Sequence, residues 1–155
     1  MTLTKLWLTL HLFFAFTFVG SLVVTEWVGG AARRAPEWRD RALLNAIIAR
    51  STPWAGLLPL VLLGVFGNLV AVGSGLSMAD PWLQIINGGW LVMAALLFAL
   101  SVPNSARLAR LSRAAMEGGS SEGFEAVLGR WRLGNMMLSV LYIVMLVMMV
   151  RQARL

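Results

Sequence analysis

The chain has 155 residues, which is enough for one domain, and 59% of them are hydrophobic while only 13% are charged. A soluble domain this small could not bury so much apolar surface, because small domains keep a large share of their residues at the surface. The absence of cysteine excludes disulfides, thiolate metal sites and a cysteine nucleophile. The net charge of +6 is better explained by membrane topology and anionic lipid than by nucleic acid, since the arginines stand between apolar stretches.

Four apolar stretches approach or reach the roughly 20 residues that a transmembrane helix needs. The first contains only His11 and, at its end, Glu26 as titratable side chains; the second and third contain no charge. The predicted spans cover residues 6–28, 53–77, 84–102 and 134–150. We therefore expect an all-α membrane protein, in which a four-transmembrane-helix bundle forms a single integral membrane domain over residues 1–155.

Two longer segments between the spans have helical patterns of their own. In residues 36–50, Leu43 and Ile47 fall on the same side of a helix, and in residues 104–116 three arginines recur every third residue. We expect both to form short interfacial helices. The stretch of residues 118–121 contains only Gly and Ser, so it is predicted to be a flexible linker.

Positive charge is distributed unequally between the two ends of the predicted bundle. The two long loops hold Arg33, Arg34, Arg39, Arg41, Arg50, Arg107, Arg110, Arg113, Arg130 and Arg132. The opposite end holds Lys5, Arg151 and Arg154. The positive-inside rule then puts both loops in the cytoplasm and both termini outside. We expect a multi-pass protein of the bacterial inner membrane with periplasmic termini.

His11 is the only histidine and lies within the first span. A neutral imidazole is the commonest metal ligand and also carries protons near neutral pH. The alternative is a structural histidine that forms a hydrogen bond across helices or at the outer interface. With span midpoints near residues 17, 65, 93 and 142, His11, Asn87 and Met148 are each about 9 Å from their midpoints toward the outside, and Asn68 is nearer the centre.

Three methionines of the fourth span, Met145, Met148 and Met149, share one helix face. Methionine is an axial haem ligand opposite histidine, and thioethers favour Cu(I). Candidate cofactor-binding residues are therefore His11, Asn68, Asn87, Met145 and Met148, and candidate metal ligands are His11, Met145, Met148 and Met149. The alternative is that methionine fills gaps between helices.

Small and aromatic residues also follow a pattern along the spans. Gly64, Gly67 and Asn68 form a small polar stripe on the second span, which favours close helix packing; a flat cofactor or quinone is the alternative. Five tryptophans fall near predicted span ends and are expected at the membrane interface, and Trp90 is deeper. The five are Trp7, Trp27, Trp54, Trp82 and Trp131.

The segment Leu10–Gly20, in which a histidine precedes a glycine by nine residues, resembles the opening of copper-resistance D type proteins and J-type protoporphyrinogen oxidases. A family of uncharacterised predicted integral membrane proteins of similar length and layout shares it. The resemblance implies a four-helix membrane fold and a haem b or copper role for His11. The J-type oxidases have a lysine in the third span, whereas residues 84–102 contain none, which counts against that activity.

The sequence carries no hydrolase, phosphate-loop or metalloprotease motif, and we predict no catalytic residue. The leading hypothesis is a non-catalytic accessory or structural subunit of a larger membrane complex, in contact with the lipid bilayer and with other membrane subunits or a second copy. One alternative is a haem b redox protein with His11 as axial ligand. Another is a copper-handling protein that uses His11 and the methionine face.

Overall fold

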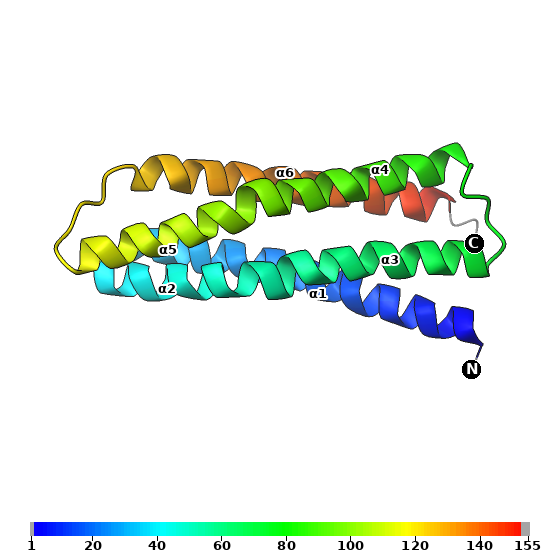
Figure 1. Ribbon diagram of the computed structural model, residues 1–155, viewed down its shortest axis with the longest axis horizontal. Helices are drawn as coiled ribbons and strands as arrows, with labels where there is room; N and C mark the ends of the chain where they lie inside the picture. Colours follow the sequence, from blue (N-terminus) through cyan, green and yellow to red (C-terminus); the bar gives the residue numbers. More distant parts are fainter. Residues whose placement is uncertain (1, 153–155) are drawn as a thin grey trace.

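The computed structural model describes residues 2–152; Met1 and residues 153–155, including the Arg154 of the charge count, lie outside the described part. Within residues 2–152 the regular structure is entirely helical, and four long rods lie side by side (Figure 1). The elements are α1 (Leu3–Arg34), α2 (Trp38–Ser51), η1 (Thr52–Leu57), α3 (Leu58–Gly73), α4 (Pro81–Leu96), η2 (Leu97–Ser101), α5 (Val102–Met116) and α6 (Phe124–Gln152), where η1 and η2 are π-helical turns.

Four helices are long and apolar enough to cross a membrane, as the sequence predicts. They comprise Leu3–Arg34, Trp38–Gly73, Pro81–Met116 and Phe124–Gln152. The second helix ends at Gly73, four residues before the predicted span end, because the chain turns there with Gly75 at a φ of +74°. The all-α, four-helix part of the prediction is thereby confirmed.

The two segments expected as separate interfacial helices are helical but continue directly from spans. Figure 1 shows α2 in line with α3, and α5 in line with α4. Each combined helix of 36 residues is about 54 Å long, well beyond a hydrocarbon core of roughly 30 Å. The physical reason is that α2 and α5 pack against each other and bury Ile48 and Leu108 in this contact, while Leu43 and Ile47 stay exposed.

Each of these long helices contains one π-helical turn. The Leu58 N–H donates to the Pro53 carbonyl in η1, and the Val102 N–H donates to the Leu97 carbonyl in η2, so both bonds join residues five apart. Pro53 lacks an N–H and cannot continue the regular α-helical pattern, which favours the wider turn at η1. The two π turns contact each other and therefore lie at the same level of the bundle.

The interior has two apolar cores separated by a polar layer. The core nearer the termini includes Phe18, Leu60, Met93 and Leu138, and the core nearer the long loops includes Ile48, Leu108, Val127 and Trp131. Between them, at and next to the π turns, six polar side chains are buried: Thr25, Thr52, Ser101, Asn104, Ser105 and Asn135. Ser101 Oγ donates to Asn135 Oδ1 at 3.1 Å, which links η2 to α6 within this layer.

Candidate polar site on helix α3

Three side chains donate hydrogen bonds to backbone carbonyls in the middle of α3. Trp90 Nε1 from α4 lies 2.8 Å from the Leu60 oxygen, and His11 Nδ1 from α1 lies 2.9 Å from the Leu63 oxygen. Asn68 Nδ2 lies 2.9 Å from the Gly64 oxygen of its own helix. Helix α3 is thus bound by polar side chains from both neighbouring helices.

His11 occupies this site as a half-buried side chain. Because a carbonyl oxygen only accepts, the ring nitrogen facing Leu63 must carry the hydrogen, which leaves the lone pair of neutral imidazole on Nε2. A Cβ atom at Gly67 would lie 2.9 Å from the His11 Cε1 atom, so glycine is needed for the imidazole to approach α3 this closely. The predicted hydrogen bond of His11 across helices is present.

Asn68 and Asn87 join α3 to α4. The Nδ2 atom of Asn68 donates to Oδ1 of Asn87 at 2.9 Å, and the reverse bond is 3.0 Å long. The two amides therefore satisfy each other within the half-buried contact. The sequence predicts Asn87 in the outer layer and Asn68 nearer the centre, and it does not predict that they pair.

Gly64 explains how Trp90 reaches α3. A Cβ atom at Gly64 would overlap the Trp90 indole, so the ring lies directly against the backbone there. The close packing predicted for the stripe of Gly64, Gly67 and Asn68 is confirmed, and its partners are Trp90, His11 and Asn87.

The predicted metal ligands, His11 and the three methionines of α6, do not share one helix contact. Met145 is buried, and its sulfur lies 2.7 Å from the position of a Cβ atom at Gly89, so it packs between α6 and α4. Met149 packs against the core nearer the termini, and Met148 is half-buried. His11, in contrast, is bonded to α3. Within residues 2–152, no three His, Asp or Glu side chains are grouped to hold a metal.

The five tryptophans expected at the interface differ in exposure, and Trp7 and Trp82 are half-buried. Trp27 and Trp54 are 75% and 71% exposed, which agrees with an interface position. Trp131 is only 1% exposed, so its expected interface position is wrong: it fills the core nearer the long loops and packs against Gly29. Within residues 2–152, its Nε1 atom has no hydrogen-bond partner.

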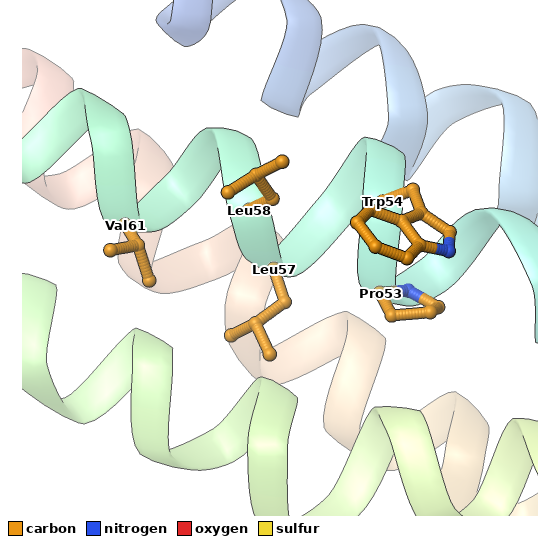
Figure 2. A pocket seen from close by; sticks show the side chains of 5 residues that line it. All are labelled: Pro53, Trp54, Leu57, Leu58 and Val61. Atoms are coloured by element: carbon orange, nitrogen blue, oxygen red, sulfur yellow. The ribbon is translucent and has the colours of Figure 1, made fainter.

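A shallow depression marks the outer side of the π turn η1. Pro53, Trp54, Leu57, Leu58 and Val61 line it, and Figure 2 shows these side chains along η1 and the start of α3. All five side chains are hydrocarbon or aromatic, so the surface suits an apolar chain and offers no acid–base chemistry.

Comparisons with known proteins yield no relative: no family model, curated protein or solved structure matches the chain. The class of the protein is therefore defined by its own fold. It is an all-α chain of four long helices, each apolar enough to cross a membrane, with a polar contact between its first three helices.

Proposed function

We propose that this chain is a multi-pass protein of the bacterial inner membrane and acts as an accessory subunit that binds a neighbouring membrane protein. Both termini face the periplasm and both long loops face the cytoplasm in this proposal. The arginine distribution supports the orientation, because ten arginines belong to the segments at the loop end of the bundle.

The observation that supports a partner is the outer face of α1. Exposed residues recur there at positions 13, 16, 20, 23 and 27, the three-and-four spacing of a helix–helix seam. The side chains are Phe13, Phe16, Gly20, Val23 and Trp27. Phe16 and Trp27 are 76% and 75% exposed, so most of each large apolar side chain is free to pack against a neighbouring protein.

Gly20 is central to that seam. A Cβ atom there would have nothing within 4 Å, so no packing inside the chain requires glycine at this position. In membranes, small residues allow a second helix to approach closely, and flanking large side chains then pack around it. The accessory-subunit proposal therefore predicts a partner helix against Gly20.

A photocrosslinking experiment tests this proposal directly, since the chain has no cysteine of its own. Gly20→Cys would be labelled with a benzophenone maleimide in native membranes and irradiated. Gly88→Cys on α4 is the matched control, because it too is exposed and has nothing within 4 Å of a Cβ atom. We expect a discrete protein adduct at position 20 only. Lipid adducts alone at both positions would contradict a partner on α1.

A haem b protein is the second candidate, and the hydrogen bond of His11 favours it. A metal-ligating histidine usually donates its other ring N–H to a carbonyl or carboxylate, as His11 does to Leu63. The residues fit one axial ligand from this chain, through Nε2. Because Met145 packs on α4, a second ligand fits better as the His11 of a second copy than as Met145, and the copper hypothesis gains less support.

Optical spectra of the detergent-purified protein distinguish this candidate. The oxidised and dithionite-reduced forms would be compared with a His11→Ala variant and a Thr9→Ala control, which removes a hydroxyl bonded only to its own helix. Reduced haem bands that disappear only in His11→Ala would support a cytochrome. A colourless wild-type protein, prepared from haem-supplied cells, would contradict it.

A further inference from the structure

Helix α5 carries an uncompensated row of positive charge. Arg107, Arg110 and Arg113 are all exposed, and residues 102–116 contain no acidic side chain. Helix α2 differs, because it contains Asp40, and its Arg41 guanidinium lies over the Trp38 ring at 4.9 Å. The charge on α5 is thus available to an external anion.

Two of these arginines border a shallow depression. Arg107, Arg110, Leu111 and Ala114 line it, and its surface is almost entirely apolar, so the aliphatic parts of the two arginine side chains border it. Residues three apart on a helix have Cβ atoms about 5–6 Å from each other, which allows both side chains to reach a single phosphate. Arginine is well suited to this contact, since its planar fork binds phosphate oxygens in pairs.

The depth of Arg107 agrees with lipid headgroups. Phe98 in η2 is 71% exposed, as a lipid-facing residue would be. Arg107 follows Val102, the end of the predicted third span, by about 7.5 Å along the helix. The polar region of a bilayer extends about 5–8 Å beyond its hydrocarbon core, so Arg107 lies near the phosphate level. Arg110 lies almost one turn farther from the core, and its long side chain can extend back to the same level.

We propose that Arg107 and Arg110 bind the phosphate of an anionic glycerophospholipid in the cytoplasmic leaflet. This inference rests on the membrane placement proposed above, and it is independent of a partner on α1. The exposed apolar side chain of Phe98 lies on the membrane side of Arg107 along the chain, which suits a phosphate that carries acyl chains better than an acidic protein segment. Binding at this site holds α5 at a fixed depth.

Native mass spectrometry of the full chain in detergent micelles tests the site. Dioleoylphosphatidylglycerol would be titrated against wild type and against Arg107→Gln/Arg110→Gln, with dioleoylphosphatidylcholine as the neutral lipid. The control is Arg33→Gln/Arg34→Gln, which removes the same charge from two exposed arginines at the same end of the bundle. Helical circular dichroism and melting temperature would establish that each variant is folded.

We expect the affinity of the first bound phosphatidylglycerol to fall more than tenfold in the α5 variant, at about fivefold for each arginine removed. The control should change less than threefold, and phosphatidylcholine binding should not change. Equal losses in both variants would show general charge attraction and overturn the site. Displacement of the lipid by millimolar inorganic phosphate would overturn the assignment to lipid. Loss of membrane insertion, seen separately by membrane fractionation, would instead contradict the proposed function.

Discussion

Asn68 on α3 and Asn87 on α4 exchange two hydrogen bonds, 2.9 and 3.0 Å long, between their side-chain amides. Asn68 also donates to the Gly64 carbonyl, so one amide is bonded to both its own helix and its neighbour. In an apolar surrounding, an amide that loses its partner has few alternatives. The pair should therefore behave as a unit when either member is replaced.

Asn87→Leu should lower the free energy of unfolding by about 1–2 kcal/mol, because it leaves the Asn68 amide partly unsatisfied. Asn68→Leu/Asn87→Leu should cost less than the sum of the two single variants. Reversible unfolding in detergent micelles measures both quantities. Gln84→Leu serves as the control, since it replaces an exposed amide on the same helix. Strictly additive costs would show that the two amides are not coupled.

Gly64→Ala should destabilise the bundle, because the added Cβ would overlap the Trp90 indole. The ring would have to rotate and lose the bond from Nε1 to the Leu60 carbonyl. Overpacking of this kind costs about 1–3 kcal/mol, more than the roughly 1 kcal/mol that alanine gains over glycine in a helix. Gly88→Ala should be neutral or stabilising, since its Cβ meets nothing within 4 Å. Equal melting temperatures for the two variants would contradict the close contact.

The spans and the glycine stripe could be predicted because hydropathy and small residues are local signals. Pairing could not, because it depends on how each helix is rotated, and one residue changes the direction of a side chain by about 100°. His11 and Met148 are expected at similar distances from their span midpoints, yet α1 packs mainly on α3 and Met145 packs on α4. Depth alone therefore did not identify the partner of His11.

The continuation of the apolar helices beyond the predicted spans was also not evident from the sequence pattern. The sequence pattern of an amphipathic helix is the same whether its apolar side faces lipid or another helix. In the structure, Asn45 Nδ2 donates to Ser112 Oγ at 2.8 Å within the buried contact of α2 and α5. A helix that lies on a membrane surface would not need Asn45 and Ser112 on its apolar side. These two polar residues could therefore have suggested that α2 and α5 pack against another helix.

The orientation can be tested with two matched cysteine variants. Ser77 and Ser120 are both exposed, and each hydroxyl accepts a bond from the backbone two residues later. A membrane-impermeant maleimide should label Ser77→Cys in cells whose outer membrane alone is permeable. Ser120→Cys should react only after the inner membrane is opened, because the arginine-rich end is expected inside. The reverse order of labelling would invert the proposed topology and remove the basis for a cytoplasmic lipid site on α5.

Trp131 and Trp90 provide a final contrast, since the Nε1 atom of Trp90 has a carbonyl partner and that of Trp131 has none within residues 2–152. Trp131→Phe should change the free energy of unfolding by less than about 1 kcal/mol, because removal of an unsatisfied buried donor offsets part of the lost packing. Trp90→Phe loses a hydrogen bond as well as volume and should cost about 1–3 kcal/mol. Trp131→Ala should cost about 3–5 kcal/mol, which shows that the side chain matters through its volume. Chemical unfolding in detergent would compare the three variants. A larger cost for Trp131→Phe than for Trp90→Phe would indicate that the Trp131 indole nitrogen is hydrogen-bonded in the folded protein, through a water or a bound group.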